Sequence, residues 1–389
     1  MNPLNDPLRS HLPNATWFAT APGRVNLLGE HVDYNDGPVL PAAIDRAVRI
    51  AAAPRKDRLA HITALDLNET AAFDLEHLPE KVDVNGKPLP GWALYPAGIA
   101  WALQSRGLPV SGLDAVFTSD VPMSAGLSSS AAVELAFSVI WQALGGWQES
   151  PMSLAHISQQ AENAYVGVKC GLMDQFASAH GVEGCALYLD TRSLLWHAIP
   201  LPPHTAIVIA DSGIRRNLTA SAYNERRSAC ETAVSLLQTQ IPGIRALRDI
   251  TPSQFAAHAG ILPSPVRERA RHVVEECSRV DRAVALLQAG DARGFGQLMF
   301  EGHASLRDLY QVSIPELDAL VEIAREVPGC WGARLTGAGF GGCTVNLVED
   351  QAAETFMNTL KTHYEKTAGR QAQIYLCHAS RGAHLETYL

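Results

Sequence analysis

The 389-residue chain lacks several features that would place it in a specialised class of protein. It has no block of lysine or arginine and its net charge is −9, so we expect no nucleic-acid partner. Its seven cysteines are scattered, odd in number and without a C-x-x-C pair, which predicts reduced thiols in a cytosol rather than a disulfide framework. The N-terminus has no basic segment followed by an apolar run, so we expect no signal peptide.

Long apolar runs are missing as well. The most apolar helix-like stretch, Ala131–Gly145, contains Glu134 and Gln142 and is too short to cross a bilayer. An apolar content of 47% with 18% charged residues is ordinary for a chain that buries its core well. The sequence therefore predicts a soluble, cytoplasmic protein with no membrane partner. Its length predicts two domains.

Periodicity and turn residues predict an α+β fold. The first 50 residues are expected to form strands joined by turns. Helices are predicted at 92–106, Ala131–Ala143, Ser153–Val168, Tyr223–Gln240 and over most of 252–327; strands are predicted at 113–122, Cys185–Leu189, Ala206–Ala210, Ala333–Leu335 and Cys343–Val348. Three prolines in "HAIPLPPH" mark a boundary near 195–205, so we expect domains at 1–200 and 201–389 with a cleft between them.

The stretch "GAGFGG" at Gly337–Gly342 fits the G-x-G-x-x-G spacing of a dinucleotide site. Such a turn should open a helix whose N-terminus receives the pyrophosphate. Here the following residues, Cys343–Val348, have the pattern of a strand. The context therefore argues against an NAD-dependent dehydrogenase.

A second small-residue stretch, "VPMSAGLSSSAAVELAFSV", joins a predicted strand to a predicted helix. Small residues let the backbone approach a ligand, and the free N–H groups of the first helical turn favour an anion. It is not a Walker A loop, because no G-K-[ST] follows. The serines could instead be helix caps, but three of them exceed what one cap needs.

Four motifs together resemble those of the galactokinases, within the GHMP small-molecule kinases. In order they are "APGRVNLLGEHVDYNDGPVLPAAID", "VPMSAGLSSSAA", "GLMDQ" and "LTGAGFGGC". The resemblance runs from about residue 15 to 380. It implies an N-terminal domain of the ribosomal-protein S5 domain 2-like type and a C-terminal ferredoxin-like domain, with the active site between them. It also implies that "GAGFGG" is a glycine loop beside the phosphate site.

The sequence departs from the family pattern at a few positions. Val32 replaces the usual threonine, and Ser124 and Ala125 stand where many relatives have glycines. Lys169 precedes "CGLMDQ", where relatives commonly have an uncharged residue. None of these changes removes a catalytic group, but Lys169 adds a charge near the expected sugar pocket.

The resemblance implies two catalytic residues. Asp174 matches the base that accepts the proton of the sugar hydroxyl, although an aspartate here could also cap a helix. Arg24 matches an arginine that keeps Asp174 ionised and offsets charge on the transferring phosphoryl group. The alternative for Arg24 is a surface arginine at a strand edge.

Sugar recognition is expected beside the first motif. A polar trio within four positions suits the donors and acceptors that sugar hydroxyls need, although loop polarity and an Asx turn at Asp33 would also explain it. His31 could be a structural histidine, and Tyr223 could serve packing. The resemblance implies these substrate-binding residues: Glu30, His31, Asp33, Gly171 and Tyr223.

The same resemblance implies a nucleotide and metal site. Trp92 and Tyr95 match an adenine pocket, although an aromatic pair at this spacing is more often core. Ser130 and Glu162 match the positions that hold Mg²⁺, an ion that prefers oxygen ligands; Glu162 could also be an exposed helical carboxylate. The expected ATP-binding loop comprises Pro122, Ser124, Ala125, Gly126, Leu127, Ser128, Ser129 and Ser130.

The sequence thus predicts a monomeric kinase that uses ATP and Mg²⁺ to phosphorylate the C1 hydroxyl of galactose. One alternative is the same chemistry on another galactose-like sugar, such as N-acetylgalactosamine. Another is a catalytically silent sugar sensor; such relatives lack two residues after the serine run, whereas Ala131 and Ala132 are present here and Asp174 is intact.

Overall fold

The computed structural model describes residues 7–123, 125–215 and 219–386, the last range without the side chains of 219–221. The helices are α1 (Pro7–His11), α2 (Leu94–Ser105), α3 (Ser129–Gly145), α4 (Pro151–Gln160), α5 (Met173–His180), α6 (Thr219–Leu237), α7 (Pro252–His258), α8 (Val266–Gln288), α9 (Ala292–Ser305), α10 (Pro315–Glu326) and α11 (Ala353–Ala368). The strands are β1 (Trp17–Leu28), β2 (Pro38–Pro54), β3 (Leu59–Ala64), β4 (Glu69–Asp74), β5 (Leu113–Ser119), β6 (Cys185–Asp190), β7 (Trp196–Pro200), β8 (Thr205–Asp211), β9 (Cys330–Thr336), β10 (Cys343–Glu349), β11 (Gln373–Cys377) and β12 (His384–Leu385).

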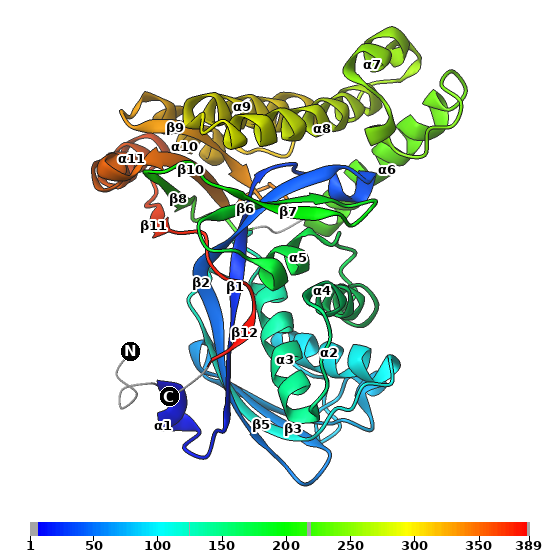
Figure 1. The fold of residues 1–389 in the computed structure, drawn as a ribbon, viewed down its shortest axis with the longest axis vertical. Helices are drawn as coiled ribbons and strands as arrows, with labels where there is room; N and C mark the ends of the chain where they lie inside the picture. The colour runs from blue at the N-terminus through cyan, green and yellow to red at the C-terminus, as the bar shows by residue number, and fades with distance from the viewer. Residues whose placement is uncertain (1–6, 124, 216–218, 387–389) are drawn as a thin grey trace.

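The long strands β1 and β2 connect the two halves of the molecule (Figure 1). They belong to an eight-stranded sheet with the order β12-β1-β2-β5-β3-β4, to which the β6–β7 hairpin is added through β2. All pairs are antiparallel except β3–β5. Both strands are buried along most of their length, including the polar residues Arg24 and Asn26 of β1.

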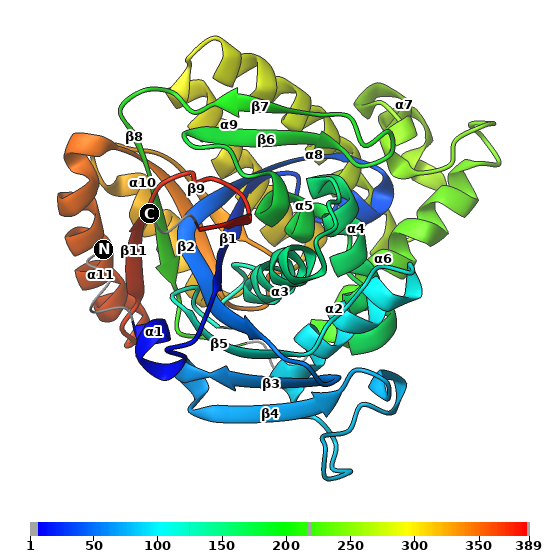
Figure 2. The ribbon, with the colours of Figure 1, turned by 60° about the horizontal axis from the view of Figure 1, so that its bottom comes forward.

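Helices α2–α5 pack beside this sheet, with α3 lying along β1 (Figures 1 and 2). The middle of α3 is buried on all sides, including Phe137 and Trp141. Burial of large aromatic side chains is a main source of folding free energy. This burial fixes the position of α3, whose first turn follows the loop after β5.

The second sheet is antiparallel, with the order β11-β8-β10-β9. Helices α10 and α11 pack on it through an apolar cluster that includes Val321, Phe356 and Tyr364. Helices α8 and α9 lie between this sheet and the β6–β7 hairpin (Figure 2). The last strand, β12, returns to the first sheet and pairs with β1.

This architecture confirms the predicted α+β class with its two sheet-containing halves. The predicted helices and strands are present, and the "GAGFGG" loop joins two antiparallel strands, β9 and β10, as the sequence pattern indicated. One predicted helix differs: Ser153–Val168 is α4 followed by a π-helical turn, Ala161–Val166. No described helix is long and apolar enough to span a membrane.

Candidate active site

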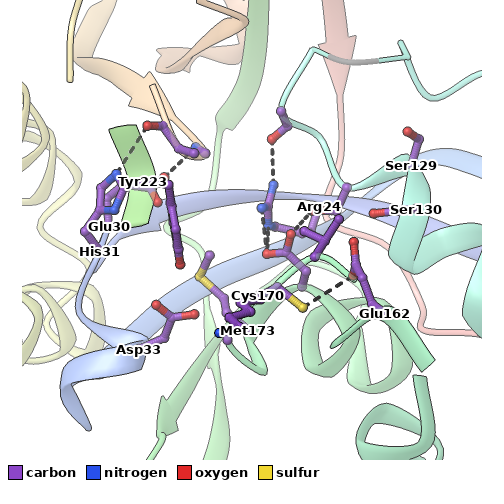
Figure 3. Close-up of a pocket in the computed structure, with 18 of the residues that line it drawn as sticks. Arg24, Glu30, His31, Asp33, Ser129, Ser130, Glu162, Cys170, Met173 and Tyr223 are labelled. Carbon is purple, nitrogen blue, oxygen red and sulfur yellow. Dashed lines mark hydrogen bonds and ion pairs between the residues drawn. The ribbon is translucent and has the colours of Figure 1, made fainter. Parts of the chain in front are cut away.

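Segments that are distant in the sequence meet around a cavity of about 540 Å³. Its wall comes from β1 and the loop after it, the start of α3, the π-helical turn, the loop before α5, α6 and the loop after β9. Figure 3 shows Glu30 and His31 on one side of this cavity and Ser129, Ser130 and Glu162 on the other. We call these the sugar-motif end and the serine end.

Asp174 lies between the two ends and is held by two side chains. Arg24 Nε and Nη2 donate to Asp174 Oδ1 at 2.9 and 2.6 Å, and Arg24 Nη1 donates to the Gly126 carbonyl at 2.7 Å. Ser128 Oγ donates to Asp174 Oδ2 at 2.5 Å. The Arg24 side chain is only 5% exposed, so this ion pair is partly shielded from water and has a fixed geometry. Both residues predicted to be catalytic therefore meet in the cavity.

The serine loop docks on β1 through a close backbone approach. The Arg24 N–H donates to the Leu127 carbonyl at 3.1 Å, and a Cβ placed on Gly23 would lie 2.7 Å from the same oxygen. A side chain at this position would therefore push the loop away. Ser128, with φ of 57°, precedes α3 but makes no side-chain capping bond, since its hydroxyl is given to Asp174. This observation removes the capping explanation for that serine.

At the sugar-motif end, the loop after β9 binds the first motif. The Gly337 N–H donates to Glu30 Oε1 at 2.7 Å, and His31 Nε2 donates to the Ala338 carbonyl at 3.3 Å. The His31 ring also lies 5.6 Å from the ring of Tyr223. The "GAGFGG" loop thus contacts the sugar motif directly, in addition to lining the cavity.

Asp33 lies against Gly171, whose Cα is so close to the Asp33 carboxylate that a Cβ would collide with it. Burial, together with the charge of Asp174, raises the pKa of Asp33 to about 7. Burial also raises the pKa of Glu30, although Arg334 and Arg24 oppose this shift. The cavity therefore holds carboxyl groups that are costly to ionise without a ligand.

At the serine end, Glu162 lies on the π-helical turn and is buried. Its Oε2 accepts from Gln175 Nε2 at 2.6 Å and from Cys170 Sγ at 3.4 Å. The same amide also donates to Glu134 Oε2 at 3.1 Å. Burial and the charge of Asp174 raise the pKa of Glu162 to about 7, and burial raises that of Glu134 well above its usual value.

The structure brings most predicted site residues together. The following line the cavity: Arg24, Glu30, His31, Asp33, Tyr95, Gly126, Ser128, Ser129, Ser130, Glu162, Gly171, Asp174 and Tyr223. Ala125 and Leu127 are buried in an apolar cluster, and Pro122 is half-buried outside the described lining. Trp92 is not among the described lining residues either; it packs on Phe117 and donates to Glu69. Ser124 lies outside the described residues.

Sequence reasoning missed the buried charges behind the sugar-motif end. Glu276 of α8 accepts from the Gly29 N–H at 2.8 Å and pairs with Arg279 and with Arg334 of β9. Arg334 also donates to the Leu27 carbonyl at 3.1 Å, so it supports the backbone just before the first motif. An arginine within the otherwise apolar strand β9 was the available signal, because a buried charge needs a partner.

Comparisons with known proteins agree with this geometry. Residues 9–54 match the model of the galactokinase galactose-binding signature, 95–182 that of the GHMP kinases N terminal domain, and 283–366 that of the GHMP kinases C terminal domain. The chain is 50% identical over 362 residues to a galactokinase of Roseiflexus sp. (strain RS-1), covering 93% of this chain and 91% of that one. It is 44% identical to a galactokinase of Chloroflexus aggregans, covering 94% and 93%. It superimposes on the crystal structure of Lactococcus lactis galactokinase complexed with galactose with a TM-score of 0.89 and 34% identity, covering 95% of this chain and 94% of that one.

The two-sheet fold, with a serine loop that opens a helix at the cavity, is that of the GHMP small-molecule kinases. Within that class, the chain belongs to the galactokinase family. It is accordingly an enzyme of the kinase type.

Proposed function

We propose that this enzyme transfers the γ-phosphoryl group of ATP to the C1 hydroxyl of galactose, giving galactose 1-phosphate and ADP. The observation that carries the proposal is the position of Asp174, between the first motif and the serine loop, with its carboxylate held by Arg24 and Ser128. A sugar at one end and a triphosphate at the other would bring the two reacting groups to this carboxylate.

In the proposed reaction, Asp174 accepts the proton of the C1 hydroxyl. The sugar oxygen then forms a bond to the γ-phosphorus, and the bond from that phosphorus to the oxygen bridging to the β-phosphate breaks, so that ADP leaves with the electron pair. Arg24 orients Asp174 through its two hydrogen bonds and offsets negative charge next to the transferring group.

Galactose would bind at the sugar-motif end. Glu30 and Asp33 supply acceptors for sugar hydroxyls, and His31 and Tyr223 form an aromatic wall beside them. Gly171 leaves the space that the Asp33 carboxylate occupies. The match of 9–54 to a galactose-binding signature supports galactose as the substrate.

ATP would bind at the serine end, with its phosphates facing the free N–H groups at the start of α3. Gly126, Ser128, Ser129 and Ser130 line the cavity there. Ala125 and Leu127 would contribute through their backbone, because their side chains are buried. Tyr95 lies in the wall and could contact the nucleotide, whereas a role for Trp92 has no support from its contacts with Glu69 and Phe117.

The residues at the serine end fit a magnesium ion. Glu162 is a buried carboxylate bonded by the neutral side chains of Gln175, Cys170 and Ser130, with no cation bound to it among the described residues. Oxygen donors and an uncompensated negative charge suit Mg²⁺, which keeps water and phosphate oxygens as its other ligands. We propose that Ser130 and Glu162 hold this ion, which would neutralise phosphate charge.

The boundary between the two domains is also a proposal. The strands of the second sheet begin with β8 at Thr205, close to a division into 1–200 and 201–389. The last strand, β12, pairs with β1, so the end of the chain supports the N-terminal half.

The test is release of ADP from ATP in the presence of single sugars, with the product identified by NMR. We expect turnover with galactose and a product whose anomeric proton is coupled to phosphorus. Turnover with N-acetylgalactosamine but not with galactose would support the alternative, in which the same reaction acts on another galactose-like sugar. Absence of turnover with every sugar, together with measurable galactose binding, would support a silent sensor.

A further inference from the structure

Lys169 lies in the loop between the π-helical turn and α5, and it lines the cavity. The backbone of this loop is fixed on both sides. The Gly167 and Val168 N–H groups both donate to the Glu162 carbonyl, at 2.9 and 3.0 Å, and the Cys170 N–H donates to Asn163 Oδ1 at 2.8 Å. The lysine therefore extends from a fixed turn rather than from a loose surface loop.

The ammonium group of Lys169 has no partner within the described part of the chain. The side chain is exposed, and no hydrogen bond or ion pair joins it to a described residue. Arg24, the other permanent cation of the described lining, is already engaged by Asp174 and the Gly126 carbonyl. Lys169 is thus the cation in this lining that remains available to a ligand.

The number of carboxyl groups in the lining favours a ligand-binding role for such a cation. Four carboxyl groups, Glu30, Asp33, Glu162 and Asp174, face two permanent cations. A nucleotide triphosphate adds several more negative charges, which the N-terminus of α3 offsets only in part. An unpaired ammonium group beside these acids would offset part of the negative charge that the triphosphate brings into the cavity.

We propose that Lys169 binds the phosphoryl group that is transferred, first as the γ-phosphate of ATP and then as the phosphate of the sugar product. This inference rests on the proposed function and adds to it a residue for which the sequence comparison gave no role. Lys169 is adjacent to Cys170, whose sulfur is 3.4 Å from Glu162 Oε2, so its turn lies at the metal-binding carboxylate. Galactose is neutral and would gain little from an ammonium group, whereas a phosphate gains a charge-assisted hydrogen bond.

The experiment measures four dissociation constants by calorimetry for the full-length wild type and Lys169→Gln. The ligands are a non-hydrolysable ATP analogue with Mg²⁺, ADP with Mg²⁺, galactose, and galactose 1-phosphate. We expect Lys169→Gln to weaken the ATP analogue by about 10-fold or more, as for loss of a hydrogen bond to a charged group. The affinity for ADP should fall less, because ADP lacks the γ-phosphate, and the affinity for galactose should be unchanged. The affinity for galactose 1-phosphate should fall as the affinity for the ATP analogue does, because both ligands carry the phosphoryl group that is transferred.

Two further variants separate charge from structure. Lys169→Arg keeps the cation and should retain most of the affinity, and its binding should stay sensitive to salt. Lys87→Gln removes an exposed lysine that is not in the described cavity wall, and it should leave all constants unchanged.

Equal affinity of wild type and Lys169→Gln for the ATP analogue would overturn the assignment. An equal loss for the analogue and for galactose would also overturn it, because it would show a general disturbance of the pocket. Failure of the wild type itself to bind the ATP analogue would instead contradict the proposed function, so the two failures are distinguishable.

Discussion

Behind the sugar-motif end of the cavity, buried carboxylates face buried guanidinium groups; behind the serine end, they face an amide. The first set, which we call the arginine cluster, comprises Glu30, Glu276, Arg279 and Arg334. Burial opposes ionisation of Glu276, yet Arg279 and Arg334 hold its pKa at about 2. Glu276 is therefore compensated without any ligand, although the pKa of Glu30 stays raised and Arg279 Nε and Arg334 Nη2 have no hydrogen-bond partner among the described residues.

The second set, the carboxylate cluster, comprises Glu134, Glu162 and Gln175. One amide nitrogen serves both glutamates, and Glu134 Oε1 is buried without a hydrogen-bond partner. Burial raises the pKa of both carboxyl groups. This cluster is therefore incomplete in the free protein.

From this difference we infer two roles for the buried charges: the arginine cluster serves the fold, and the carboxylate cluster is where we propose that a cation binds. Paired charges fix the backbone around Leu28, because Glu276 binds the Gly29 N–H and Arg334 binds the Leu27 carbonyl. The acids at the serine end have no cationic partner among the described residues, and we propose that a bound cation supplies one. Four predictions test this contrast.

The largest effect is expected from Arg334→Met, which breaks the arginine cluster. It leaves Glu276 and Glu30 buried with less compensation, and loss of one partner of a buried pair costs about 3–5 kcal/mol. The measurement is the free energy of unfolding in denaturant. The control is Arg49→Met, whose pair with Asp120 is 35% and 38% exposed and should be worth about 0–1 kcal/mol. Equal losses in the two variants would refute the structural role of the cluster.

Asp174→Asn sharpens the contrast, because Asp174 is a paired acid that we place in the chemistry. The change keeps the shape and an acceptor for Arg24 but removes the proton acceptor. We expect turnover to fall by about 10²-fold or more in a folded protein. Steady-state kinetics with a circular dichroism control is the measurement, and unchanged turnover would rule out Asp174 as the base.

Glu162→Gln removes one charge from the carboxylate cluster. We expect the Mg²⁺ midpoint of the initial rate to move to higher concentration, with much of the lost activity returning at high Mg²⁺. A Mg²⁺ titration at fixed ATP and galactose measures this. Identical midpoints for variant and wild type would mean that the metal site lies elsewhere.

The last of the four predictions concerns the pH dependence of stability. The pKa of Asp33 is raised from 3.8 to about 7 in the folded protein, so the folded state holds a proton that the unfolded state releases. The resulting stability is fully present below about pH 4 and is lost as pH rises to about 7. The free energy of unfolding of the wild type should therefore fall between about pH 4 and about pH 7. That of Asp33→Asn should fall less over the same range. Parallel curves for the two proteins would contradict the raised pKa.

Much of the fold followed from local patterns, because apolar periodicity and turn residues are local properties. The strand after Gly342 correctly argued against a dinucleotide turn. The π-helical turn that carries Glu162 was not predicted, since it shares the apolar spacing of an ordinary helix. Ala125 and Leu127 were predicted as members of the ATP-binding loop, and the sequence did not indicate that their side chains are buried in the core.

The candidate site was predicted from motifs rather than from geometry. Arg24 and Asp174 are 150 positions apart, and no periodicity brings them together. The same limit explains why the pairing within the arginine cluster was missed: its members come from β9, α8 and the first motif, and no local pattern links them. Long-range pairing of buried charges is a tertiary property.

The most direct test makes the same substitution at one glutamate of each cluster. The free energy of unfolding is measured for Glu276→Gln and Glu162→Gln at pH 8 without nucleotide or Mg²⁺, where the carboxyl of Glu162 with its pKa of about 7 is largely ionised. We predict that Glu276→Gln loses about 3 kcal/mol or more, because it leaves two buried arginines short of a partner. Glu162→Gln should keep or gain stability. A loss of similar size in both variants would contradict the account.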